Sequence, residues 1–109
     1  MMSQMINSVY EISSTNYLDD KLIINNALSD LAAQCGLQNE FDFGQPTSRF
    51  GWTFFKVWIK PNFYALIEQN LGDMIKRSKG HKPEEKFTNF LSDYFQSKGC
   101  KVKVKMTDA

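Results

Sequence analysis

The segment that decides the fold is FGWTFFKVWIK, residues 50–60. Aromatic and β-branched side chains fill it and Pro61 follows directly, which is typical of a strand that ends where a helix begins. With strict alternation, odd and even positions face opposite sides of a sheet. The odd side would be Thr53, Phe55, Val57 and Ile59, and the even side Phe50, Trp52, Phe54, Lys56, Trp58 and Lys60. We expect a central strand with a core on the odd side and rings interleaved with lysines on the even side.

Two arrangements would bury the even-numbered rings instead. A bulge at Phe54 and Phe55 would shift the register and bring Phe50, Trp52 and Phe54 to the core side. The first helix of the chain would also bury these rings if it covered the second face of the sheet. The sequence leaves both alternatives open, although Trp58 keeps its side with or without the bulge.

Helical periodicity marks three segments outside this strand. The first lies near residues 17–35, with Asp19 and Asp20 in its first turn and Gly36 as its stop. The second begins at Pro61 and reaches about Ser78. The third begins at Pro83 and ends before Gly99.

The remaining segments predict strands. Residues 37–49 alternate Phe41 and Phe43 before a run of turn-forming residues, which indicates a β-hairpin with residues 50–60. Residues 100–106 alternate apolar side chains with lysines and indicate a half-buried last strand. Residues 1–15 are weakly patterned and fit either a short strand or a loose arm. The sequence therefore predicts one α+β domain over residues 1–109, a small two-layer sandwich of three helices on a mainly antiparallel sheet.

Composition excludes several classes of protein. The chain has 109 residues, 42% of them hydrophobic and 14% aromatic, which is typical of a globular domain and too apolar for a disordered tail. No stretch approaches the roughly 20 apolar residues of a membrane span. The N-terminus has neither the basic nor the apolar region of a signal peptide. We therefore expect an unprocessed, cytoplasmic protein with no membrane association.

Charge is unevenly distributed although the net charge is +1. Residues 1–50 hold two cations against six acids, and residues 51–109 hold eleven cations against six acids. Such a division produces a two-faced surface only if folding keeps the halves apart. The sequence alone leaves open whether the charges separate or interleave in space.

Signatures of catalysis are absent from the sequence. It has no phosphate-binding glycine loop, metalloprotease motif or nucleophile elbow. The single histidine, His81, falls in a turn between two helices, and no base lies near Cys35 or Cys100 in the sequence. Two cysteines are too few for a disulfide framework or a zinc site, so we expect both to be core thiols. We expect no enzyme activity, no cofactor and no metal.

The rings and lysines of residues 50–60 are the best candidate for a binding surface. Adjacency to the last strand would add its lysines and give one contact set: Trp52, Lys56, Trp58, Lys60, Lys101, Lys103 and Lys105. A partner protein would use the rings as buried anchors and the lysines as a charged rim. Nucleic acid would stack its bases on the rings and place its phosphates on the lysines. We expect a partner-protein-binding module of accessory or inhibitor type, with a nucleic-acid-binding module as the alternative.

Two weaker features accompany this candidate surface. A second basic patch occurs between the second and third helices and consists of Lys76, Arg77, Lys79 and Lys82. These residues could contact a phosphate backbone, but cations at a helix C-terminus and a solvated turn explain them as well. An exposed edge strand or aromatic face would also permit a homodimer.

Overall fold

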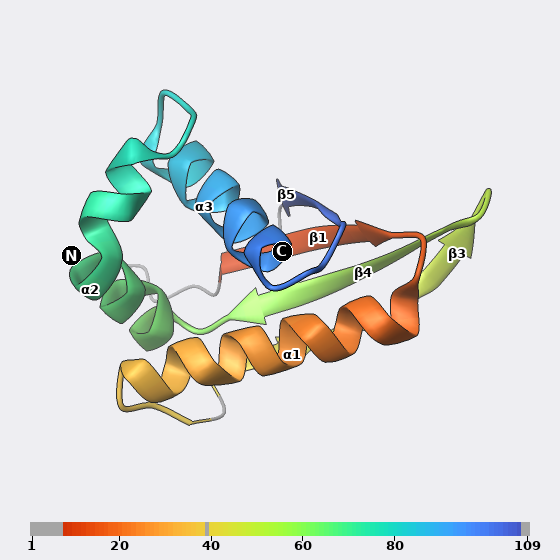
Figure 1. The fold of residues 1–109 in the computed structure, drawn as a ribbon, viewed down its shortest axis with the longest axis horizontal. Helices are drawn as coiled ribbons and strands as arrows, with labels where there is room; N and C mark the ends of the chain where they lie inside the picture. Colours follow the sequence, from red (N-terminus) through yellow and green to blue (C-terminus); the bar gives the residue numbers. More distant parts are fainter. Residues whose placement is uncertain (1–7, 39, 108–109) are drawn as a thin grey trace.

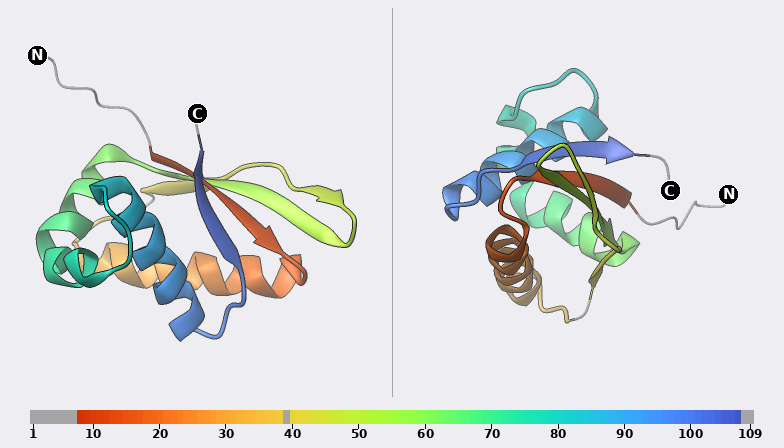
Figure 2. Two further views of the ribbon diagram at one scale, coloured as in Figure 1. Left: turned by 90° about the horizontal axis from the view of Figure 1, so that it is seen from above. Right: turned by 90° about the vertical axis from the view of Figure 1, so that its right-hand side faces the viewer.

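A computed structural model describes residues 8–38 and 40–107 of the chain. Three helices lie on one face of an antiparallel sheet, so the predicted α+β sandwich is confirmed (Figures 1 and 2). The elements in chain order are β1 (Ser8–Ser14), α1 (Tyr17–Gln34), β2 (Phe41–Phe43), β3 (Thr47–Arg49), β4 (Trp52–Ile59), α2 (Pro61–Arg77), α3 (Pro83–Ser97) and β5 (Lys103–Thr107). The expected bounds of the three helices are confirmed to within two residues.

The sheet order is β2-β4-β1-β5, and β3 also pairs with β4 beyond the end of β2. If β2 and β3 count as one edge strand and α2 and α3 as one crossover, the connectivity is the split βαβ arrangement. The weakly patterned N-terminal segment supplies a central strand, β1, in its described part. The last strand, β5, pairs with β1, so the condition that it adjoins residues 50–60 is not met: β1 lies between β5 and β4.

The register of β4 resolves the question of which side its rings occupy. β1 pairs with β4 without interruption, from Ser8 opposite Ile59 to Ser14 opposite Thr53, which excludes a bulge in β4. The irregularity lies in the edge strand instead, where residues 44–46 separate β2 from β3 and face two residues of β4. The two sides of β4 are therefore kept apart along its whole length.

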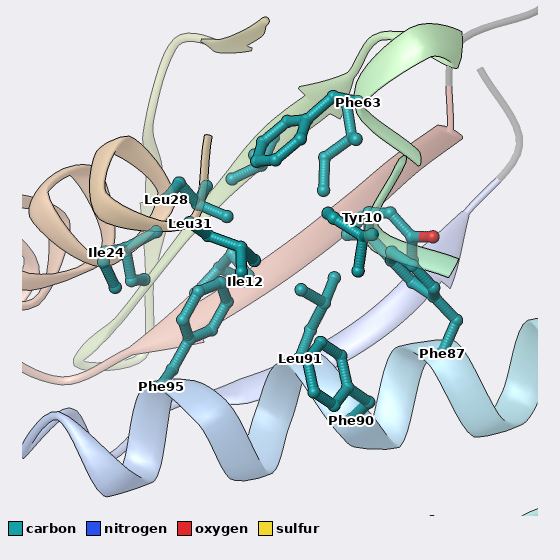
Figure 3. Packing of buried hydrophobic residues seen from close by; sticks show 14 of the residues in the cluster. Tyr10, Ile12, Ile24, Leu28, Leu31, Phe63, Phe87, Phe90, Leu91 and Phe95 are labelled. Carbon is teal, nitrogen blue, oxygen red and sulfur yellow. The ribbon is translucent and has the colours of Figure 1, made fainter. Parts of the chain in front are cut away.

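The core lies between the helices and the helix-facing side of the sheet. Ile12 of β1 points toward Leu91 and Phe95 of α3, while α1 contributes apolar side chains from the other side (Figure 3). The ring of Tyr10 stacks on Phe87 of α3 at a centroid distance of 5.9 Å. Full burial of an apolar side chain of this size contributes about 1.5–3 kcal/mol. The core therefore anchors the helices to one face of the sheet.

A buried hydrogen bond joins the end of β1 to the start of α1. The Ser14 hydroxyl donates to the Asp20 carboxylate at 2.5 Å, and the backbone N–H of Asn16 donates to the Ser14 oxygen at 3.0 Å. Both Ser14 and Asp20 are buried. Since a buried carboxylate is costly without a donor, this bond holds the β1–α1 turn in place.

We expect Ser14→Ala to lower the free energy of unfolding by about 1–3 kcal/mol, because the buried Asp20 carboxylate would lose its hydroxyl donor. Urea denaturation of the two proteins measures this difference. Ser13→Ala is the matched control, since Ser13 is the adjacent residue on the other side of β1, and it should change stability by less than about 0.5 kcal/mol. Equal effects of the two substitutions would contradict the role of Ser14.

Candidate binding surface on the open face of the sheet

The side of the sheet that points away from the helices is uncovered by any helix of the described chain (Figure 2). We call this side the open face. Register and alternation assign to it Val9, Glu11 and Ser13 of β1, Asp42 of β2, Thr47 and Arg49 of β3, Trp52, Phe54, Lys56 and Trp58 of β4, and Lys103, Lys105 and Thr107 of β5. The four β4 residues are all partly exposed, whereas Phe55, Val57 and Ile59 are buried under the helices.

Cations lie over two of the three rings on the open face of β4. The Arg49 guanidinium is 5.0 Å from the centroid of the Phe54 ring, and the Lys103 ammonium is 5.4 Å from that of Trp52. Arg49 comes from the edge strand β3 and Lys103 from the opposite edge strand β5. Positive charge therefore reaches the central rings from both sides of the sheet, with an attraction of about 0.5–1 kcal/mol for each exposed pair.

The Trp58 indole packs against the backbone of Gly44, in the segment between β2 and β3. A Cβ added at Gly44 would lie 2.7 Å from Cη2 and 2.8 Å from Cζ3 of the Trp58 ring. The Gly44 N–H donates to the Lys56 carbonyl at 2.8 Å, which holds this backbone against β4. Because Gly44 has no side chain, the Trp58 indole can lie flat against the sheet at this point.

A shallow hollow of about 350 Å³ opens on this face between the rings of Phe54 and Trp58. Its walls include the cations Arg49 and Lys56 and the carboxylate of Glu11. The Glu11 carboxylate lies 3.8 Å from the Lys105 ammonium and, in register, between Lys56 and Lys105. The hollow combines flat apolar walls with positive charge and one acidic group.

Two residues of the predicted contact set lie outside the strands. Lys60 follows β4 and leads into α2, and its backbone N–H donates to the Glu40 carbonyl at 3.0 Å. Lys101 is exposed in the connection between α3 and β5. The set's other members, Trp52, Lys56, Trp58, Lys103 and Lys105, share the open face.

The second basic patch lies around the α2–α3 turn, which meets β5 at a hollow lined by Gly80, His81 and Lys105. All four of its residues are exposed around the α2–α3 turn, at the opposite end of the molecule from the β3–β4 hairpin (Figure 1). Lys86 and Asn89 of α3 donate to backbone carbonyls there, including that of Lys76 at 3.2 Å and that of Lys79 at 2.7 Å. These bonds satisfy the end of α2, which gives this turn a structural role.

Three contributors to the open face were absent from the predicted contact set. The sequence predicts Phe54 on the even side of the strand and Gly44 in a run of turn-forming residues, and it assigns no role to Arg49. The sequence does contain a signal for Arg49. Phe50 and Gly51 lie between two extended segments, and a glycine at the second position is typical of a two-residue hairpin turn. Such a turn pairs Arg49 with Trp52. The contact between Gly44 and Trp58 depends on the edge irregularity and has no local signal.

His81, Cys35 and Cys100 lie on separate segments of the described chain. His81 is exposed in the α2–α3 turn, where its backbone N–H donates to the Glu85 carboxylate at 2.8 Å. Cys100 is buried, as expected, whereas Cys35 is only half-buried and its sulfur accepts a 3.5 Å hydrogen bond from Asn70. Among residues 8–38 and 40–107, no cluster of three potential metal ligands occurs.

We expect the two thiols to react at very different rates with an aromatic disulfide reagent. Burial, together with nearby Asp20, raises the pKa of Cys100 to about 12, so its thiolate is scarce at pH 8. One thiol should react quickly in the native protein and the second only after unfolding. Cys35→Ser should remove the fast phase, and a second fast thiol in the wild-type protein would contradict this assignment.

We expect Gly44→Ala to push the Trp58 indole off the sheet, because the new methyl group would occupy its place. In a Trp52→Phe background only Trp58 remains as tryptophan, and its quenching by acrylamide should increase. Gly72→Ala is the control, since a Cβ at Gly72 would meet no atom within 4 Å. Unchanged quenching in Gly44→Ala would contradict the packing of the indole on this backbone.

Comparison with known proteins adds no relative to this description. The chain matches no protein family model, no curated protein and no solved structure. None of the described helices is long and apolar enough to cross a membrane. The geometry and charge of the open face are therefore the features that indicate a function.

Proposed function

We propose that the protein binds single-stranded nucleic acid on the open face of its sheet. The observation that carries this proposal is the row of three partly exposed aromatic side chains, Trp52, Phe54 and Trp58, on the side of a central strand that no described helix covers. Flat rings on an open sheet offer stacking surfaces to unpaired bases, each worth about 1–3 kcal/mol. Such binding tolerates many sequences because every base has a π face, and it requires no sequence motif.

Cations placed around the rings supply the second requirement, contact with phosphates. Arg49 lies on one edge strand, Lys56 lies between the rings, and Lys103 and Lys105 lie on the other edge strand. A strand stacked along β4 would have positive charge on both sides of its backbone. Each phosphate contact would release counterions and make the affinity depend on salt.

The charge of the open face itself supports the same conclusion. The helices hold eight acids and four cations, and their caps and the α2–α3 turn add four more cations, Lys60, Lys79, Lys82 and Lys98, so the helix layer is nearly balanced. The open face holds four cations against two acids, Glu11 and Asp42. A net charge of +1 therefore understates the attraction that this face offers to an anionic ligand.

A partner protein is the second candidate ligand, and the mixed charge of the face favours it. Glu11 and Asp42 would repel phosphates but could accept hydrogen bonds from a protein surface. The same rings would then act as buried anchors, with Lys60 and Lys101 near the rim. Accessory or inhibitor action would follow from occlusion of the partner.

Titration with a fluorescently labelled oligodeoxythymidylate tests the first candidate. We expect binding that weakens roughly 15- to 60-fold from 50 to 200 mM salt, as expected for about four phosphate contacts on a single strand. Trp58→Ala should weaken binding about 5- to 150-fold through loss of one stacked base, and Trp58→Phe should retain most of the affinity.

A matched pair of cation variants separates specific contact from general charge. Lys56→Gln should reduce the slope of log affinity against log salt by about 0.7, whereas Arg77→Gln, at the end of α2 beside Asp93 and Ser97 of α3, should leave it unchanged. Absence of oligonucleotide binding by the wild-type protein at 50 mM salt would reject the first candidate. Capture of a protein that survives nuclease and 200 mM salt, and is lost in Trp58→Ala, would then favour the second.

A further inference from the structure

The turn between β3 and β4 contains an unusual residue. Arg49 pairs with Trp52, so Phe50 and Gly51 form a two-residue turn, with φ values of 54° and 82°. Two positive φ values are characteristic of a type I′ turn, which favours Asn, Asp or Gly at its first position. Phe50 is the only residue other than glycine with positive φ among the described residues. A bulky side chain in this conformation is a genuine outlier.

Solvent exposure adds to the cost of this residue. The Phe50 side chain is 99% exposed, and the hairpin that carries it extends to one end of the molecule (Figure 1). Its ring makes none of the aromatic or cation contacts found elsewhere in the described chain. A phenylalanine at this position therefore stabilises neither the turn nor the core. Backbone strain of this kind is often found where a residue serves a function outside the fold.

Phe50 lies in the turn that leads directly into β4, the strand that carries the row of rings. The hairpin turn places the Phe50 backbone beyond Trp52, at the end of β4 where the row of rings begins. Arg49, its neighbour in sequence, and Lys103, over Trp52, place cations at this end of the open face. A single strand that stacks along β4 and continues outward would reach the Phe50 ring with its next base.

We propose that Phe50 is the terminal stacking platform for single-stranded nucleic acid and binds the base next to the one on Trp52. This inference rests on the proposed function and adds one base to its binding site. Because the ring is free and fully exposed before binding, it can offer a whole π face to the base. The strain at Phe50 is then tolerated because an asparagine would stabilise the turn but could not provide this stacking surface.

Titrations of labelled oligodeoxythymidylates of two to ten nucleotides at 50 mM salt test this inference. In the wild-type protein, affinity should rise with length until the strand spans Trp58 to Phe50. In Phe50→Asn the rise should stop one nucleotide earlier, and affinity for the longest oligonucleotide should fall about 5- to 150-fold. Phe50→Trp should bind like the wild-type protein, and Phe50→Leu should bind like Phe50→Asn because leucine has no π face.

Thermal unfolding excludes misfolding as the cause of lost binding. Phe50→Asn should raise the melting temperature, since Asn-Gly is a preferred type I′ pair. A more stable variant that binds less tightly would support the role of Phe50 as a ligand contact.

The possible failures are distinguishable from one another. If Phe50→Asn binds every length like the wild-type protein, the terminal platform is rejected and the proposed function stands. If Phe50→Leu retains the wild-type affinity while Phe50→Asn loses it, the ring inserts into an apolar environment and stacking is rejected. If the wild-type protein binds no oligonucleotide, the proposed function fails and the inference fails with it.

Discussion

The pairing of β1 with β4 is the constraint on which the rest of the structure depends. These strands lie side by side at the centre of the sheet, and their register runs unbroken from Ser8–Ile59 to Ser14–Thr53. Side chains alternate along a strand, so a shift of one residue would exchange the two faces of β4. Phe55, Val57 and Ile59 would then leave the core, and Trp52, Phe54 and Trp58 would have to enter it. The helix layer and the open face are two consequences of one register.

The positions of many charged side chains follow from local requirements of helices and strands. Carboxylates are favourable in the first turns of helices, where they meet the positive end of the helix dipole, and the first turns of α1 and α3 each carry two. Lysines on edge strands are favourable because they discourage pairing with another chain, and β5 carries Lys103 and Lys105. Local requirements of helices and strands therefore place carboxylates at the starts of two helices and cations on the edges of the open face. The helix layer is nearly balanced, because its caps and the α2–α3 turn add Lys60, Lys79, Lys82 and Lys98.

The helices, the central strand and the two sides of that strand could be predicted from the sequence. The order of the strands in the sheet could not. Periodicity located the three helices, and strict alternation in residues 52–59 assigned Trp52, Lys56 and Trp58 to the correct side. The place of β1 between β4 and β5 depends on pairing over long distances in the chain, which a local pattern does not specify. For the same reason the sequence does not show that β5 is separated from β4 by β1, or that the Lys103 side chain still reaches the Trp52 ring across it. Phe50 was assigned to the strand because aromatic content outweighed the turn signal of Gly51.

Exposed aromatic rings favour self-association, and the cations of the open face oppose it. A flat aromatic surface on a small sheet invites association with other molecules of the same kind. Arg49 over Phe54 and Lys103 over Trp52 keep charge above these rings in the free protein, and like charge opposes face-to-face pairing of two copies. Both side chains come from edge strands, so they can move aside without disturbing the core. In the proposed complex, bases would replace the cations over the rings, and the displaced guanidinium and ammonium groups would remain close enough to meet the phosphates.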